Sequence, residues 1–159
     1  MFLIGQYDSP FVRRVAIAMR LYGMPFEHRP WSTFSNADKI APYNPLHRVP
    51  TLVLDNGEAL IESAAILDYL DEAVGPEKAM LPSRGEARRR QLRLCALATG
   101  LGDKAVSLVY ERVLRFTGEA HAALFDAARY PALAAHAAHC EQLAPFKEIV
   151  QPLAPPSGD

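Results

Sequence analysis

The chain has 159 residues, of which half are hydrophobic and 22% are charged. That balance is typical of a folded protein rather than a disordered one, and the length suits one domain or two small ones. Its 17 basic and 18 acidic residues give a formal net charge of −1. Without a basic excess, nucleic acids and anionic membranes are disfavoured as partners, and small molecules or proteins are favoured.

Neither cysteine nor histidine spacing predicts a metal site. Cys95 and Cys140 lie in stretches rich in alanine and leucine, with no CxxC motif, so we expect unpaired, buried thiols. His136 and His139 share a helix face, with His121 upstream, but only Cys140 has a matching ligand spacing. The start of the chain lacks a basic segment, and no stretch approaches the ~20 apolar residues of a membrane span. We therefore expect a cytoplasmic protein.

The first half of the chain predicts an α/β unit. The apolar run Phe2-Leu3-Ile4 is followed by Ser9-Pro10 and then by apolar residues at helical spacing, which indicates strand, turn and helix. Asp55-Asn56-Gly57-Glu58 is a strong hairpin turn signal between two apolar strands. The predicted order is β-α-β-α-β-β-α, with strands at 2–4, 26–31, 51–54 and 59–61, a short helix within 32–41, and helices that begin after Ser9 and at an N-cap Ser63.

The second half predicts helices only. Residues 75–85 hold two prolines and two glycines and are typical of a linker. Leucines then recur at helical spacing from 86 to about 115, where Gly100 and Gly102 predict a kink or a close helix contact. A final helix is predicted over 131–143, and the proline-rich tail 152–159 is not expected to form regular structure. We therefore predict an α/β domain at 1–74, a linker at 75–85 and an all-α domain at 86–159.

Ser9 is the first candidate for chemistry. A serine between a strand and a helix lies beside unpaired backbone N–H groups and the positive end of the helix dipole, where an anion is stabilised. A hydroxyl donor and a helix N-terminus together would lower the pKa of a bound thiol by about two units, from about 8.5. Taken alone, however, an isolated serine in this position is more simply an N-cap.

Two further pairs have the same ambiguity. Glu62-Ser63 opens a predicted helix, where hydroxyl and N–H groups suit a ligand carboxylate and the glutamate suits an ammonium group. Val49-Pro50 precedes a strand, and a cis bond there would turn the Val49 backbone toward a peptide-like ligand. Each pair alone has a structural explanation, helix capping for the first and a strand edge for the second.

Together, in this order, the three motifs resemble a known family. The segments are Tyr7-Asp8-Ser9-Pro10-Phe11-Val12-Arg13-Arg14-Val15, Asn44-Pro45-Leu46-His47-Arg48-Val49-Pro50-Thr51-Leu52 and Ile61-Glu62-Ser63-Ala64-Ala65-Ile66-Leu67-Asp68-Tyr69-Leu70. They closely resemble the thioredoxin-like domain of bacterial serine-type glutathione transferases, and the match spans residues 1 to 82. The resemblance implies a thioredoxin-like N-terminal domain, glutathione as co-substrate, no metal, and a two-fold homodimer.

The resemblance also implies a role for each matching residue. Ser9 would donate a hydrogen bond to the glutathione thiolate, and Glu62 with Ser63 would hold the γ-glutamyl end. Val49, before a cis-Pro50, would pair its backbone with the cysteinyl unit. Arg48, where the family usually has lysine, would meet the glycyl carboxylate. The expected glutathione-binding set is Ser9, Phe11, Arg48, Val49, Pro50, Glu62 and Ser63, with Ser9 as the catalytic residue.

Two positions depart from the family pattern or compete with it. His47 replaces a common glycine, which puts the local backbone and the approach of Arg48 in question. Tyr7 is a rival hydroxyl, since other members of the superfamily use a tyrosine near the end of the first strand. The Ser-Pro pair at the helix start favours Ser9, with Tyr7 as a packing residue.

The helical half resembles the family less completely. Residues 86–113 resemble its first long helix and 115–156 its end, joined around Leu114 to Thr117 without the helices and the Ser/Thr-x-x-Asp segment that usually lie between. Loss of those helices would leave apolar surface uncovered and one wall of the electrophile pocket open. Either a partner chain covers that face or the C-terminal part unfolds.

The leading hypothesis is an enzyme that conjugates the glutathione thiolate to an electrophilic small molecule, as in detoxification. The alternative is a non-catalytic module that binds glutathione or another protein and keeps the fold. A thiol-disulfide enzyme is disfavoured because Ser9 stands where that chemistry needs a cysteine.

Overall fold

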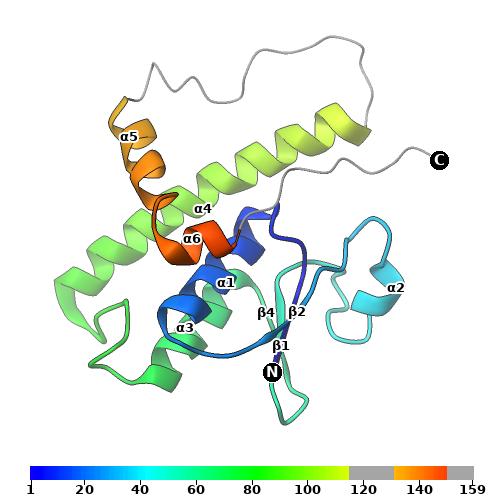
Figure 1. The fold of residues 1–159 in the computed structure, drawn as a ribbon, viewed down its shortest axis with the longest axis horizontal. Helices are drawn as coiled ribbons and strands as arrows, with labels where there is room; N and C mark the ends of the chain where they lie inside the picture. Colours follow the sequence, from blue (N-terminus) through cyan, green and yellow to red (C-terminus); the bar gives the residue numbers. More distant parts are fainter. Residues whose placement is uncertain (115–130, 150–159) are drawn as a thin grey trace.

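The structure is a computed structural model that describes residues 1–114 and 131–149. Its helices and strands follow one another from an α/β part into a helical part (Figure 1). The elements are β1 (Phe2–Ile4), α1 (Pro10–Leu21), β2 (Glu27–Arg29), α2 (Ala37–Ile40), β3 (Thr51–Val53), β4 (Ala59–Ile61), α3 (Ser63–Val74), α4 (Gly85–Leu114), α5 (Pro131–Cys140) and α6 (Ala144–Glu148). The predicted order β-α-β-α-β-β-α is therefore confirmed for the first half.

The four strands form one sheet in the order β2-β1-β3-β4. β1 pairs parallel with β2 and antiparallel with β3, and β3 pairs antiparallel with β4 across the predicted hairpin. β2 is shorter than the predicted 26–31, because Pro30 has no N–H to donate to the ladder and the strand ends at Arg29. This mixed sheet is the thioredoxin-like arrangement that the sequence predicted.

Alternate strand residues face two separate cores, as a period of two requires. Leu3 and Leu52 are buried against α1 and α3, on the face that also receives Val12, Ile66 and Leu70. Ile4 and Val53 face the opposite way and pack with Ile40 of α2. The sheet is therefore covered on both faces, and the loops at its edge, where α1 and α3 begin, are held in fixed positions.

Gly5 connects β1 to α1 at a point where no side chain fits. Its φ is +127°, and a Cβ there would lie 2.5 Å from Cγ2 of Val12 and 2.8 Å from Cβ of Val49. Glycine is therefore required both by the backbone conformation and by the close approach. The contact brings the loop that carries Val49 against the beginning of α1, next to Ser9.

The glycines of α4 produce a close helix contact rather than a break in the helix. α4 is assigned as one helix from Gly85 to Leu114. A Cβ on Gly102 would lie 3.5 Å from the Phe11 ring, whereas nothing lies within 4 Å of Gly100. Gly102 thus allows the middle of α4 to approach the first turn of α1.

The last predicted helix, 131–143, is wrong at its end. α5 stops at Cys140, and after a turn α6 begins at Ala144. Pro145 cannot donate a hydrogen bond to a carbonyl of the preceding turn, so a single helix cannot continue through it. Leu143 is instead extended, with φ −70° and ψ 141°. The predicted junction at 114–117, His121 and the tail 152–159 lie outside the described residues, apart from Leu114 itself.

The end of the described chain is attached to α1. Ile149 is only 1% exposed and lies in the core beside α1. Arg13 Nε donates to the Ile149 carbonyl at 2.9 Å, and Arg13 Nη2 donates to both carboxylate oxygens of Glu141 at 2.7 and 2.8 Å. α6 therefore packs over α1 (Figure 1), and α1 is held between the sheet and the last helices.

Candidate functional site

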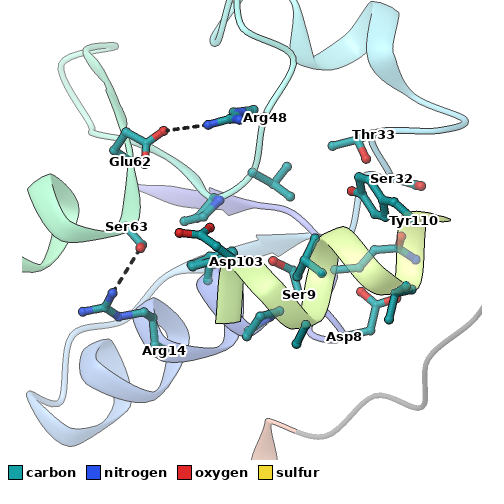
Figure 2. Close-up of a pocket in the computed structure, with 18 of the residues that line it drawn as sticks. Asp8, Ser9, Arg14, Ser32, Thr33, Arg48, Glu62, Ser63, Asp103 and Tyr110 are labelled. Carbon is teal, nitrogen blue, oxygen red and sulfur yellow. Dashed lines mark hydrogen bonds and ion pairs between the residues drawn. The ribbon is translucent and has the colours of Figure 1, made fainter. Parts of the chain in front are cut away.

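A cavity of about 800 Å³ lies between the N-terminal ends of α1 and α3, the loop before β3, and the middle of α4. Figure 2 shows the side chains that point into it from these elements. Every residue predicted to bind glutathione lines this one cavity: Ser9, Phe11, Arg48, Val49, Pro50, Glu62 and Ser63. The three motifs that are separate in the sequence thus meet in space.

Ser9 lies at the start of α1 as its N-cap. Its Oγ accepts a long hydrogen bond of 3.4 Å from the Val12 N–H, and Pro10 is in the first turn of the helix. The capping bond uses an oxygen lone pair, so the hydroxyl proton remains available for a ligand. The N-cap interpretation and the functional one are therefore compatible in this geometry.

Tyr7 occupies a different environment from Ser9. Its ring stacks on His28 with centroids 3.8 Å apart and planes 3° from parallel. Burial raises the pKa of Tyr7, an effect that the positive charge of Arg20 partly opposes. Tyr7 lines a smaller neighbouring cavity of about 510 Å³, and it is not among the residues that line the larger one.

The Val49-Pro50 peptide bond is cis, and His47 before it has φ 53°. His47 therefore adopts the left-handed conformation that glycine prefers, which is the conformation that a glycine at this position would suit. The Val49 N–H and C=O make no hydrogen bond with any described residue. Two backbone groups are thus left for a ligand at the cavity wall.

Glu62 and Ser63 begin α3, although not with the predicted cap. Glu62 rather than Ser63 is the N-cap residue, with φ 69° and no capping hydrogen bond from its side chain. The predicted N-cap at Ser63 is wrong because the Ser63 hydroxyl lies inside the first turn, 5% exposed, and accepts a hydrogen bond from Arg14 instead. A positive φ at a non-glycine residue is a strained conformation that is common at functional sites.

The Arg48 and Glu62 side chains form a loose ion pair at the mouth of the cavity. Arg48 Nη1 and Glu62 Oε1 are 3.7 Å apart, and the side chains are 73% and 60% exposed (Figure 2). Solvent weakens an exposed pair of this length, which contributes little to stability. This ion pair can therefore break at little cost, which lets each side chain bind the opposite charge of a ligand.

Sequence reasoning missed Arg14 as a site residue, although it lies within the first quoted motif. Arg14 Nη1 donates to Ser63 Oγ at 3.4 Å, and its side chain lines the cavity (Figure 2). Burial lowers the pKa of Arg14, but a guanidinium stays charged in proteins. Its position was the available signal, because Arg14 follows Pro10 by four residues, and residues four apart lie on the same face of a helix.

The remaining wall of the cavity comes from the loop after β2 and from α4. The Phe34 and Tyr110 rings meet across it at 5.4 Å with an interplanar angle of 63°. Asp8 and Asp103 also line the cavity, and their carboxylates make no hydrogen bond or ion pair with any described residue. Local sequence patterns do not reveal this wall, because only the packing of α4 against the loop brings these residues together.

Among residues 1–114 and 131–149, no three His, Cys, Asp or Glu side chains converge as a metal site would require. Cys140 Sγ lies 3.6 Å from His136 Nε2. Cys95 and Cys140 are unpaired and partly rather than fully buried. Across residues 1–114 and 131–149, no helix combines the length and apolarity needed to cross a bilayer.

Comparison with known proteins identifies the first half of the chain. Residues 3–78 match the family model of the glutathione S-transferase N-terminal domain. An uncharacterised GST-like protein, YibF of Escherichia coli, is 35% identical over 110 residues, 69% of this chain and 54% of the relative. Glutathione S-transferase U6 of Arabidopsis thaliana is 34% identical over 70 residues, 44% of this chain. The matched regions thus span about half of the first relative and 31% of the second.

A solved structure extends the likeness along the chain. A glutathione transferase family member from Pseudomonas fluorescens Pf-5, with bound glutathione, is 26% identical and superposes with a TM-score of 0.76. The superposition covers 96% of this chain and 99% of the other. The chain therefore has the glutathione S-transferase fold, and its residues 3–78 match the model of that family's N-terminal domain.

Proposed function

We propose that this protein is a glutathione transferase that conjugates the glutathione thiolate to an electrophilic small molecule. The observation that carries the proposal is the meeting of Ser9, the free Val49 backbone and the Glu62-Ser63 pair around one cavity. These groups match the parts of a γ-glutamyl tripeptide: a thiol, a peptide unit and an amino acid end. The glutathione bound to the Pseudomonas relative supports the same ligand.

In this proposal each group has one task. The Ser9 hydroxyl donates to the sulfur and, with the N-terminus of α1, favours the thiolate. The Val49 N–H and C=O pair with the cysteinyl unit, and Pro50 and Phe11 line the wall beside it. Arg48 takes the glycyl carboxylate. Glu62 takes the γ-glutamyl ammonium, while Ser63, Arg14 and the N–H groups of α3 take its carboxylate.

We also propose the finer assignments that the family resemblance implies: a serine-type enzyme, cytoplasmic, using no metal, with domains at 1–74 and 86–159 joined by a linker at 75–85. The helical half is a shortened form of the family's C-terminal domain. The exposure of Leu94, Leu97 and Leu101, at 65%, 62% and 56%, supports this shortening. Leucines at helical spacing on α4 are ordinarily covered by a neighbouring helix.

A second copy of the chain is the proposed cover for that face of α4. Sedimentation velocity is expected to give a dimer, and Leu97→Glu is expected to shift it toward the monomer because it places a charge in an apolar contact. Leu21→Glu is the control, since Leu21 is similarly exposed, at 54%, at the end of α1. A monodisperse wild-type monomer would count against the homodimer.

The same exposed leucines favour one alternative, a non-catalytic module that binds glutathione or a protein and has lost the acceptor pocket. Calorimetric titration with glutathione separates the possibilities, with Ser9→Ala and Glu62→Ala run in parallel. Binding that weakens in Glu62→Ala, followed by turnover of an electrophile, supports the enzyme. Binding without turnover of any electrophile supports the module, and a folded wild type that does not bind glutathione rejects the glutathione site.

A further inference from the structure

The cavity is lined by both basic and acidic side chains. Its arginines, Arg14 and Arg48, lie on the side formed by the Glu62-Ser63 pair: Arg14 donates to Ser63 and Arg48 pairs loosely with Glu62. The other carboxylates of the lining, Asp8 and Asp103, make no hydrogen bond or ion pair within the described part of the chain. Figure 2 shows Asp8 close to Ser9 and Asp103 between Ser9 and Ser63.

Bound glutathione would change the balance of these charges, a step that rests on the proposed function. At neutral pH glutathione carries two carboxylates and one ammonium group. If the carboxylates are held by Arg14 and Arg48 and the ammonium by Glu62, the positive charge of both arginines is neutralised. Asp8, Asp103 and the thiolate then remain, so an arriving acceptor meets net negative charge.

The wall that faces this charge is aromatic. Phe34, from the loop after β2, and Tyr110, from α4, meet edge to face with centroids 5.4 Å apart. Both rings are partly exposed, at 45% and 41%, so they offer apolar surface to a ligand. A flat ring can pack on such a pair, and an aromatic face also attracts cations.

We infer that the acceptor is a planar electrophile that is neutral or cationic, and that Asp8 and Asp103 are specificity-determining residues that exclude anionic acceptors. The discrimination is electrostatic, since both aspartates would repel a carboxylate on the acceptor. Such a carboxylate would also lack a cationic partner in the lining, because bound glutathione neutralises Arg14 and Arg48. A trimethylammonium or amide group in the same position would be attracted or tolerated. The Phe34–Tyr110 pair supplies the apolar contact that acceptors with a carboxylate, a trimethylammonium or an amide group would share.

The test uses three chloronitrobenzenes that share one ring and differ in charge. The chlorine is ortho to the nitro group, and a carboxylate, carboxamide or trimethylammonium group stands para to the chlorine. In each reaction the sulfur–carbon bond forms, the carbon–chlorine bond breaks, chloride leaves with the bonding electrons, and the thiol proton goes to solvent. Dividing kcat/KM by the uncatalysed rate constant with glutathione removes the difference in intrinsic reactivity.

In wild type, kcat/KM divided by the uncatalysed rate constant is expected to be about tenfold or more higher for the cationic than for the anionic acceptor. Two carboxylates that are partly screened by solvent would produce a preference of this size. Asp8→Asn and Asp103→Asn are each expected to reduce this ratio by about threefold to fivefold. Asp38→Asn, which removes an exposed carboxylate of α2 outside the cavity, is expected to leave the ratio unchanged. High salt is expected to reduce the preference in wild type.

A wild type that accepts the carboxylate as well as the cation, or a ratio unaffected in both aspartate variants, overturns the inference while leaving the transferase intact. If no acceptor reacts, the proposed enzyme fails instead. The charge preference is then measured by calorimetry, titrating the three unreactive analogues that lack chlorine into protein saturated with glutathione. Equal affinities in that titration would overturn the inference independently of activity.

Discussion

Arg14 Nη1 and Ser63 Oγ, on residues 49 positions apart in the sequence, are joined by a hydrogen bond of 3.4 Å. The bond connects the second turn of α1 to the first turn of α3, and residues at the beginnings of both helices line the same cavity. A partly buried guanidinium and a buried hydroxyl, each with further hydrogen-bonding capacity, form a site prepared for a carboxylate.

Replacement of Arg14 by alanine is expected to weaken glutathione binding. Loss of one charge-assisted hydrogen bond removes about 1.5 to 3 kcal/mol, so Kd should rise by roughly tenfold to a hundredfold. Arg14→Lys keeps the charge without the planar guanidinium and should give an intermediate value. Arg93→Ala, on the exposed surface of α4, is the control. Calorimetry that gives unchanged affinity for Arg14→Ala would exclude Arg14 from the glutathione site.

Replacement of Ser9 by alanine is expected to reduce kcat/KM at neutral pH by about a hundredfold, as for loss of one donor to a developing anion. Without the donor the pKa of the bound thiol rises toward about 8.5, so activity should partly recover as the pH is raised to 9 or so. Ultraviolet absorbance of the thiolate across this pH range measures the pKa directly. Tyr7→Phe should change kcat/KM by less than about threefold. A large loss of kcat/KM in Tyr7→Phe with little loss in Ser9→Ala would instead make Tyr7 the donor.

Replacement of Arg13 by alanine is expected to loosen the last helices from α1. Arg13 holds both the Ile149 carbonyl and the Glu141 carboxylate, and its side chain is 29% exposed. Allowing for solvent screening, we expect a loss of about 1 to 2 kcal/mol in the free energy of unfolding. Arg20→Ala is the control, because its pair with Glu148 is longer, at 3.7 Å, and more exposed. Equal losses in urea unfolding of the two variants would show that Arg13 has no special role.

Tyr22 is expected to make stability fall at high pH. Burial, and next a hydrogen bond to Asp71, raises the pKa of Tyr22 to about 12 from about 10 in the unfolded chain. Between these values the unfolded state loses the proton while the folded state keeps it, so unfolding becomes more favourable as the pH rises. Below about pH 10 the contribution is fully present.

Chemical unfolding at several pH values from about 9 to 12 measures this slope. Tyr22→Phe should be less stable at neutral pH, because Asp71 would lose the Tyr22 hydroxyl as a donor and the Met80 N–H would lose its 2.7 Å bond to that hydroxyl, keeping only the longer bond of 3.2 Å to Asp71. The variant should also have a smaller slope between about pH 10 and 12. Tyr69→Phe in α3 serves as a comparison that keeps Tyr22. An unchanged slope in Tyr22→Phe would mean that another group titrates.

Most of the α/β part was predictable because its signals are local. The hairpin at Asn56-Gly57, the Ser9-Pro10 helix start and the alternation that places Leu3 and Ile4 on opposite faces all depend on neighbouring residues. The errors were also local in origin. The effect of Pro145 on the end of α5 and that of Pro30 on the end of β2 both arise from a missing N–H.

The sequence by itself determined the order of the elements, the residue types at the three motifs and the absence of a thiol at the start of α1. Only the tertiary structure decided that Arg14 reaches Ser63, that Phe34 meets Tyr110, and that Asp8 and Asp103 line the cavity that contains Ser9. The reason is physical: helix and turn preferences act within a few residues, whereas these contacts depend on how α4 approaches α1. That approach depends on packing at Gly102 and Phe11, which no spacing in the sequence reveals.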